Sequence, residues 1–144
     1  MEFYIPKYFK LFEVLSEVDY KHFKNKGWLS WKYFNPKLLK AMDFIREYTG
    51  EKIFINNWKF GGNLNWCGLR TKNCDMDNYK SRHFFGCAMD LHVLGYDSSE
   101  KYDKLRNKLL ELPVFLELIN EIEFGINWLH IGIGNHEKVE KYYL

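Results

Sequence analysis

The sequence predicts a single α+β domain over residues 1–144, with a small, mainly antiparallel sheet flanked by helices. The length of 144 residues suits one hydrophobic core, and the composition, 47% hydrophobic and 28% charged, is typical of a globular protein. No repeat, low-complexity tract or linker divides the chain. Helical spacing and short strand-like runs alternate along it in the order helices, strand, long loop, strand, helices, strand.

The first third of the chain is predicted to be largely helical. Residues 7–18 place apolar side chains at helical spacing, which favours a short helix. Residues 20–34 are aromatic and basic without a clear period, so we expect an irregular segment packed over the core. Asn35 and Pro36 are a strong helix start, and Gly50 is a good stop, so a helix is predicted between them.

Two strands and a long loop are predicted in the middle of the chain. Residues 52–55 and 89–93 have the composition of short strands. Residues 57–80 are rich in Asn, Gly, Asp and Cys, which predicts a long loop. Loops of this length in small domains are often functional.

The last third is predicted to hold two helices and a strand. Asp97 and Glu100 resemble a capping box that opens a helix through about Leu112. Pro113 is expected to start a further helix over residues 113–122, and residues 128–133 form the last strand.

Composition excludes several classes of partner. The net charge of +2 and the absence of a basic arm give no reason to expect nucleic acid binding. No apolar run is long enough to cross a membrane, and the first residues lack a signal-peptide pattern. We therefore expect synthesis in a cytoplasm and no membrane partner; the oligomeric state is left open.

The cysteines are expected to be free thiols. Their number is odd and no signal peptide precedes them, and the order Cys67, Cys74, His83, Cys87 lacks the paired spacing of a structural zinc site. Buried or half-buried thiols are the favoured interpretation.

The segment SRHFFGCAMDLHV, residues 81–93, places polar side chains that can bind metals among apolar ones. Such groups are costly to bury unless something satisfies them. A strand at 89–93 points Asp90 and His92 to one face, and Gly86 permits a turn that folds His83 back beside Asp90. If this strand pairs with the last one, His130 joins them.

Two imidazoles and one carboxylate suit zinc with an open position for water, whose pKa zinc lowers to about 7. A general base and an oxyanion-stabilising group would complete the site, and Glu121, Glu123 and Arg70 are the candidates. The alternative is structural: packed, hydrogen-bonded histidines, and an aspartate that caps a turn. On composition and spacing alone, that alternative is the more frequent outcome.

The run Ser81-x-His83-x-x-Gly86-x-Ala88-x-Asp90 resembles the signature of the zinc metallopeptidases that include D-Ala-D-Ala carboxypeptidases and endolysins, which share the hedgehog/DD-peptidase fold. Trp-Leu-His-Ile at 128–131 is similar to the second signature of that family. The runs NWKFGG at 57–62 and GLRT at 68–71 resemble a phage-encoded branch. The resemblance covers about residues 36–138.

The resemblance implies roles for particular residues. His83, Asp90 and His130 correspond to the zinc ligands, and Arg70 to the arginine that binds the substrate carbonyl or terminal carboxylate, a task that suits its fork of donors. Ser81 corresponds to a serine that supports the ligand loop. His92 matches no ligand position and is expected near the site or hydrogen-bonded, where it could orient a ligand.

The chain departs from the family at two positions. Many relatives carry the base glutamate where Asn127 stands, so the proton acceptor is expected to be Glu123, as in the phage-like branch, with Glu121 as the alternative. The similar branch has an aspartate where Gly132 stands, which places turnover in question more than metal binding. Aromatic side chains expected to shape the cleft are Trp58, Trp66 and Phe84.

The resemblance implies a zinc-dependent peptidase that hydrolyses peptide bonds in bacterial peptidoglycan, with a stem peptide as substrate. A phage origin implies action on the cell wall after release, or from a virion. The alternative is a zinc-binding, catalytically silent structural or wall-binding module of a phage. A weaker alternative is a thiol enzyme that uses Cys87 with His83.

Overall fold

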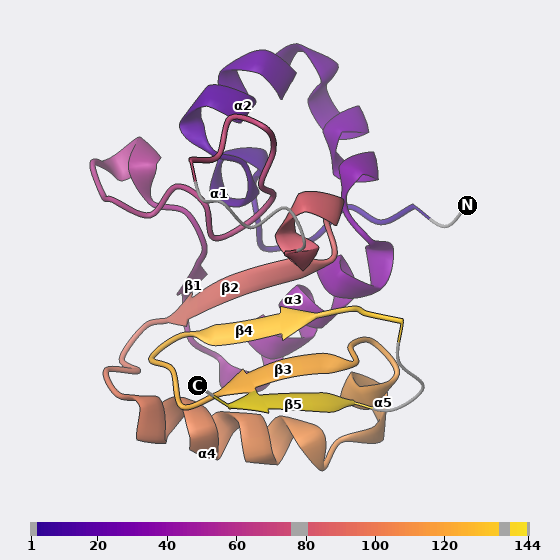
Figure 1. Ribbon diagram of the computed structural model, residues 1–144, viewed down its shortest axis with the longest axis vertical. Helices are drawn as coiled ribbons and strands as arrows, with labels where there is room; N and C mark the ends of the chain where they lie inside the picture. The colour runs from indigo at the N-terminus through magenta and orange to yellow at the C-terminus, as the bar shows by residue number, and fades with distance from the viewer. Residues whose placement is uncertain (1–2, 76–80, 136–138, 144) are drawn as a thin grey trace.

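The protein is a single small α+β domain, as predicted (Figure 1). The structure, a computed structural model, describes residues 3–75, 81–135 and 139–143. Within these residues one open, mixed sheet has the strand order β1-β2-β4-β3-β5. The strands are β1 (Ile53–Phe54), β2 (Ala88–Val93), β3 (Glu121–Phe124), β4 (Leu129–Gly132) and β5 (Glu140–Tyr143).

The register of the central strands decides which side chains share a face. β2 and β4 are antiparallel and place Asp90 opposite His130. β3 is antiparallel to β4, with Ile122 opposite Ile131, and parallel to β5. Because successive side chains in a strand alternate between faces, the polar residues of β2, β3 and β4 gather on one face and the apolar ones on the other.

The apolar face forms the core with two long helices. α3 (Pro36–Thr49) passes behind the sheet in Figure 1, and α4 (Ser99–Leu110) runs along its lower edge. The apolar strand residues are buried in one cluster with both helices; they include Met89, Leu91, Ile122, Leu129 and Ile131. Burial of these side chains is the main stabilising term of the fold.

The ends of α3 are those that the sequence predicts. The Asn35 side chain accepts a hydrogen bond from the Lys37 backbone N–H at 2.9 Å, and Pro36 is the first helical residue. Gly50 ends the helix with a φ of 69°, a left-handed conformation that favours glycine.

The N-terminal region differs from the prediction. The single helix expected over residues 7–18 is two short helices, α1 (Leu11–Val14) and α2 (Glu17–Phe23). The segment expected to be irregular is largely η1 (Lys24–Tyr33), two 3₁₀ pieces separated by a kink at Gly27. The break falls at Ser16, whose buried hydroxyl accepts from the Asp19 N–H at 3.1 Å and caps α2. A cap inside the apolar pattern therefore divides the helix.

The helix predicted over residues 113–122 is wrong beyond its first turn. α5 (Pro113–Leu116) ends early, and β3 follows, with Ile122 and Phe124 in the core. The alternation Glu-Ile-Glu-Phe fits a strand with one buried face. Further along, β5 was not predicted. α4 begins one residue later than expected, with Ser98 as its cap, while Asp97 forms an ion pair with Lys101 at 2.8 Å.

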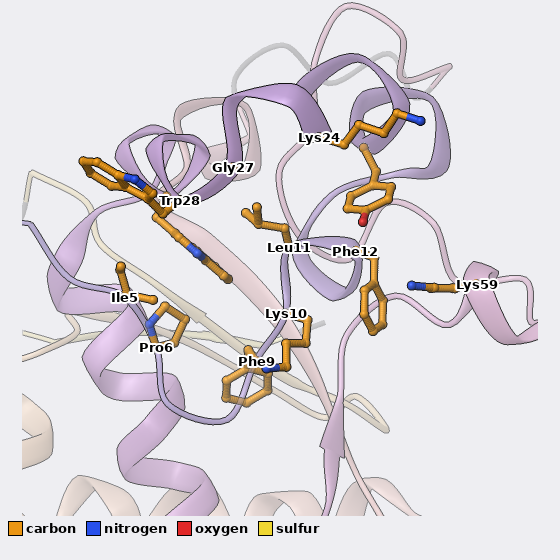
Figure 2. A pocket seen from close by; sticks show the side chains of 12 residues that line it. Ile5, Pro6, Phe9, Lys10, Leu11, Phe12, Lys24, Gly27, Trp28 and Lys59 are labelled. Atoms are coloured by element: carbon orange, nitrogen blue, oxygen red, sulfur yellow. The ribbon is translucent and has the colours of Figure 1, made fainter.

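A pocket of about 490 Å³ opens in the N-terminal region, between the first residues of the chain and α1, α2 and η1 (Figure 2). Aromatic rings and lysines line it, including Phe9, Trp28 and Lys59. None of the predicted site residues lies there. Across the described ranges, no helix combines the length and the apolar character needed to cross a bilayer.

Candidate metal centre

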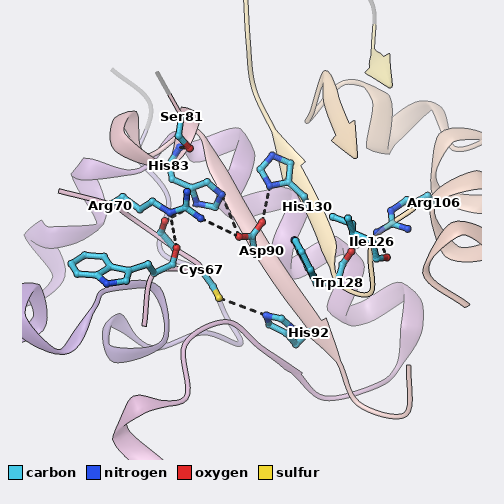
Figure 3. A network of polar contacts seen from close by, with 12 residues as sticks. Cys67, Arg70, Ser81, His83, Asp90, His92, Arg106, Ile126, Trp128 and His130 are labelled. Atoms are coloured by element: carbon cyan, nitrogen blue, oxygen red, sulfur yellow. Dashed lines mark hydrogen bonds and ion pairs between the residues drawn. The ribbon is translucent and has the colours of Figure 1, made fainter. Parts of the chain in front are cut away.

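The structure brings His83, Asp90 and His130 together (Figure 3). One potential ligand atom from each residue lies within 4.8 Å of the other two. His83 and Asp90 are buried, with 2% and 8% of their surfaces exposed. Asp90 comes from β2, His130 from β4, and His83 from the short 3₁₀ helix η3 (Arg82–Phe85). The predicted ligand triplet is therefore a real cluster in the fold.

The local sequence of the motif delivers His83 to the cluster. Ser81 precedes η3, and its hydroxyl accepts from the His83 N–H at 3.4 Å, which agrees with the supporting role expected of this serine. Gly86 ends η3 with a φ of 64°, and a Cβ there would run into the Tyr33 carbonyl. Only glycine fits this turn, which leads directly into β2.

The orientation of the His83 ring is fixed by a backbone carbonyl. His83 Nδ1 lies 2.8 Å from Gly68 O. A carbonyl can only accept, so Nδ1 carries the proton and Nε2 keeps its lone pair for the cluster. Nε2 lies 3.5 Å from Asp90 Oδ2. This is the arrangement that usually orients a metal-binding histidine.

Asp90 and His130 form a short hydrogen bond, with His130 Nδ1 and Asp90 Oδ1 2.6 Å apart. Burial alone would raise the pKa of Asp90, but the hydrogen bond from His130 and the nearby imidazole of His83 outweigh it and hold that pKa well below its usual range. Burial lowers the pKa of His130, but the hydrogen bond to Asp90 and the charge of Asp90 raise that pKa above its usual value. The carboxylate is therefore ionised, as a metal ligand must be.

The cluster fits a metal ion. Tetrahedral coordination at about 2.0–2.2 Å separates ligand atoms by roughly 3.3–3.6 Å. The His83–Asp90 pair is at 3.5 Å, and the His130–Asp90 pair at 2.6 Å needs to part by less than about 1 Å. Two nitrogens and one oxygen leave a fourth position open, so the group can hold a metal ion and a further ligand.

Arg70 reaches the same site from the long loop. Its Nη2 lies 3.5 Å from Asp90 Oδ2, and its Nε donates to Trp66 O at 2.8 Å. Its backbone N–H donates to His83 O at 3.1 Å, which ties the loop to the ligand turn. The Arg70 side chain is only 13% exposed.

The two candidate bases occupy different environments on β3. The β3–β4 register pairs Glu121 with Gly132 and Ile122 with Ile131, and its extension by one residue places Glu123 opposite His130 on the polar face. Both carboxylates act electrostatically on His130 and raise its pKa. Glu121 is 4% exposed and receives a 3.0 Å hydrogen bond from Arg82 Nε, whereas Glu123 is half-buried. Glu123 is therefore the more accessible of the two carboxylates.

The two departures from the family pattern have structural consequences. A Cβ on Gly132 would lie 3.0 Å from Glu121 Oε2, so the Glu121 carboxylate fills the space that a side chain at position 132 would need. Asn127 is exposed in the turn between β3 and β4. An acidic group is therefore present beside His130 despite Gly132, but it comes from the neighbouring strand.

A cleft of about 310 Å³ opens beside the cluster. Trp66, Arg70, Asp90 and Trp128 are among its lining residues. Of the aromatic side chains expected to shape the cleft, Trp66 does so. Trp58 instead donates to Leu15 O at 2.9 Å, and Phe84 is half-buried on η3 and is not among the residues that line the cleft.

Sequence analysis missed two supporting arginines. Arg82 holds Glu121, and Arg106 is fully buried and donates to the carbonyls of Ile126 and Trp128 in the β3–β4 turn (Figure 3). These contacts shape the turn that precedes His130. The signal for Arg106 was an arginine among the apolar positions of α4; its partners lie in the turn between β3 and β4, and β3 was not predicted.

The cysteines play no part in the cluster. All three are free and half-buried, as predicted. Burial raises the pKa of Cys87, whose thiol donates to Phe85 O at 3.4 Å. Both ring nitrogens of His83 face other groups, Gly68 O and Asp90. The geometry therefore disfavours a thiol enzyme built on Cys87 and His83.

His92 lies at the edge of the site, as expected, but it does not contact a ligand side chain. Its Nε2 is 3.6 Å from Cys67 Sγ, and its ring stacks on Phe54. The partner that orients a ligand is Gly68 O.

No protein-family model, curated protein or solved structure matches the chain.

Proposed function

We propose that the protein is a zinc-dependent peptidase that hydrolyses peptide bonds in bacterial cell-wall peptidoglycan, of the D-Ala-D-Ala carboxypeptidase or endolysin type. The observation that carries the proposal is the convergence of His83, Asp90 and His130, three residues distant in sequence that the family signatures single out. The resemblance to a phage-encoded branch supports lysis or entry as the biological context.

His83, Asp90 and His130 would hold the zinc ion. Bound in an open site, zinc supplies Lewis acidity and makes a water molecule nucleophilic near neutral pH. The protein contributes a buried, pre-oriented donor set: Gly68 O fixes His83, and the β2–β4 pairing fixes Asp90 against His130. Such preorganisation limits the reorganisation needed during the reaction.

Glu123 is proposed as the general base and acid. It would take a proton from the water that attacks the amide carbonyl, then deliver that proton to the leaving amine. Its place opposite His130 puts it on the face where the substrate must lie, and its partial exposure leaves it accessible. Glu121, held by Arg82, would orient the ligand turn.

Arg70 is proposed to bind the substrate. Its guanidinium faces Asp90 across 3.5 Å and lines the cleft, so its donors can reach a carbonyl oxygen, a developing oxyanion or a terminal carboxylate. The backbone bond from Arg70 to His83 couples the position of this donor to that of a ligand.

The test combines zinc analysis with a cleavage assay. The purified protein is expected to contain one zinc ion per chain at this site and to release free amines from purified peptidoglycan. A chelator should abolish release, and added zinc should restore it. Peptidoglycans of several cross-link types identify the bond that is cleaved.

The second candidate is a zinc-binding, catalytically silent module of a phage. The absence of an acidic residue at Asn127 and Gly132 is the observation that favours it. Bound zinc without amine release from any wall type would support the module and contradict the peptidase.

A further inference from the structure

A thiol and an imidazole face each other on the wall of the cleft, outside the predicted ligand triplet. Cys67 Sγ lies 3.6 Å from His92 Nε2, and both residues line the cleft beside Asp90. Figure 3 shows the pair close to, but separate from, the cluster of His83, Asp90 and His130. Neither the proposed reaction nor the family signature uses these two side chains.

The distance between the two atoms is that of a chelating pair. A tetrahedral zinc ion holds a thiolate sulfur at about 2.3 Å and an imidazole nitrogen at about 2.0–2.1 Å, which sets the two ligand atoms about 3.5 Å apart. The observed separation is 3.6 Å. The separation of the two atoms therefore allows both side chains to bind one ion.

The Cys67 backbone and the His92 ring are held in place by their neighbours. The Cys67 N–H donates to Asn56 Oδ1 at 2.9 Å, and Cys67 O accepts from the Asp90 N–H at 2.8 Å. The His92 ring stacks on Phe54, with centroids 5.3 Å apart and planes at 16°. Rigid support of this kind lowers the cost of ordering ligands around an ion.

The cleft provides the remaining coordination positions. Its volume of about 310 Å³ accommodates water ligands next to the pair. Thiolate and imidazole together select soft or borderline cations rather than Mg²⁺ or Ca²⁺. With two protein ligands instead of three, this pair should bind a given ion more weakly than the triplet does.

We propose that Cys67 and His92 form a second cation site, specific for soft or borderline ions such as Zn²⁺, Cd²⁺ and Co²⁺. Binding exchanges the thiol proton, which leaves to solvent, for the metal ion, with no change in oxidation state. The occupied site places an ion and its water shell in the cleft beside Arg70 and Asp90. If the proposed peptidase function holds, on which this last step rests, the ion blocks the substrate.

Cobalt titration of the metal-free protein under reducing conditions tests the site without any assay of activity. A thiolate ligand gives cobalt an intense near-ultraviolet charge-transfer band, whereas the triplet offers only nitrogen and oxygen. The wild type should show this band. Cys67→Ser should abolish it and His92→Gln should weaken it, while the matched thiol controls Cys74→Ser and Cys87→Ser should keep it.

His130→Asn separates the two sites, because it removes a triplet ligand and should leave the band intact. Circular dichroism and thermal unfolding of each variant show whether it is folded. A wild type without the band, or a band of full intensity in folded Cys67→Ser, would overturn the proposal.

Blocking of the cleft is tested by measuring the rate of amine release in the wild type and in Cys67→Ser, with and without cadmium beyond one equivalent. For each protein, the rate with cadmium is divided by the rate without it. This ratio should fall in the wild type and stay near one in Cys67→Ser. Equal inhibition of both proteins would refute the blocking. If neither protein releases amines, the peptidase function fails, while the cobalt band still decides the second site.

Discussion

The two faces of the central strands divide stability from chemistry. On one face, Met89, Leu91 and Ile131 are fully buried in the apolar cluster with α3 and α4. On the other, Asp90 and His130 lie opposite each other, with the carboxylates of β3 alongside. The two sets alternate residue by residue along the same strands, so a single change of register would exchange them.

This comparison shows how a small domain can place ionisable groups close together without unfolding. The apolar face supplies the burial that offsets the cost of the polar one. On the polar face, each buried group has a partner: His83 has Gly68 O, Asp90 has His130, and Glu121 has Arg82. Substitutions on the two faces should therefore have separable effects.

The largest effect is expected on the polar face. In a Cys67→Ser background, which lacks the second cation site, His130→Asn keeps an amide that can donate to Asp90 but removes a good metal ligand, so bound zinc should fall from one ion per chain to none and amine release should stop. The free energy of unfolding of the metal-free protein should change by no more than about 1 kcal/mol. Metal analysis and chemical denaturation measure both quantities, and a variant that still binds stoichiometric zinc would remove His130 from the site.

Glu123→Gln tests the proton acceptor next to that ligand. The variant should retain zinc and lose about 10²–10⁴-fold in kcat, because the amide cannot take a proton. Its matched control is Glu121→Gln on the same face of β3, expected to lose less. Steady-state amine release gives the comparison, and a larger loss in Glu121→Gln would exchange the roles of the two glutamates.

The apolar face should respond in the opposite way. Ile131→Ala, one residue from His130, should lower the free energy of unfolding by about 2–5 kcal/mol through the cavity that it leaves. Zinc content should stay at one ion per chain at temperatures where the variant is folded. Denaturation and metal analysis check this, and loss of zinc from the folded variant would show that the two faces are not separable.

Gly132→Ala probes the boundary between the faces. Its new methyl group would meet the Glu121 carboxylate at 3.0 Å, so we expect a loss of about 1–3 kcal/mol in stability from overpacking. The same substitution in a Glu121→Ala background should cost less, because the clashing group is gone. A double-mutant cycle measures the coupling, and additive effects would contradict the proposed contact.

The smallest effect concerns pH. The pKa of His130 is raised above its ordinary 6.5, so the bond to Asp90 stabilises the metal-free protein fully below that pH and is lost as pH rises through the higher folded-state pKa. Because the pKa of Asp90 is lowered, the contribution of its carboxylate to stability is fully present above the ordinary pKa of 3.8. Stability of the metal-free protein should therefore decline above neutral pH.

Zinc affinity should show the opposite trend, rising with pH as His130 loses its proton. Denaturation and zinc titrations at a series of pH values test both slopes in the wild type. His130→Asn is the control, because it lacks the titrating group and its stability should not show this decline.

The sequence was most informative where local rules and tertiary packing agree. Asn35, Pro36 and Gly50 delimit α3 because caps and stops act locally. The ligand triplet was predicted from the resemblance to the zinc metallopeptidases, since composition and spacing alone favoured the structural alternative. Strand alternation and the turn at Gly86 account for His83 beside Asp90, whereas His130 comes from a strand 40 residues further along the chain.

The features that were not predicted depend on contacts between distant segments of the chain. The cap at Ser16 could not be distinguished from a helical interior until Asp19 was seen buried beside it. Pro113 to Ile122 has apolar residues at helical spacing, yet β3 forms because Ile122 fits beside Ile131. β3 was not predicted. The sequence therefore could not show that Glu123 lies opposite His130, or that the Glu121 carboxylate fills the space beside Gly132.

Anomalous scattering from crystals grown with one equivalent of zinc tests the central claim most directly. The proposal predicts that the strongest anomalous peak at the zinc edge lies between His83 Nε2, the Asp90 carboxylate and His130, with bonds of about 2.0–2.2 Å. Density maps that place no zinc within reach of these three side chains would contradict it.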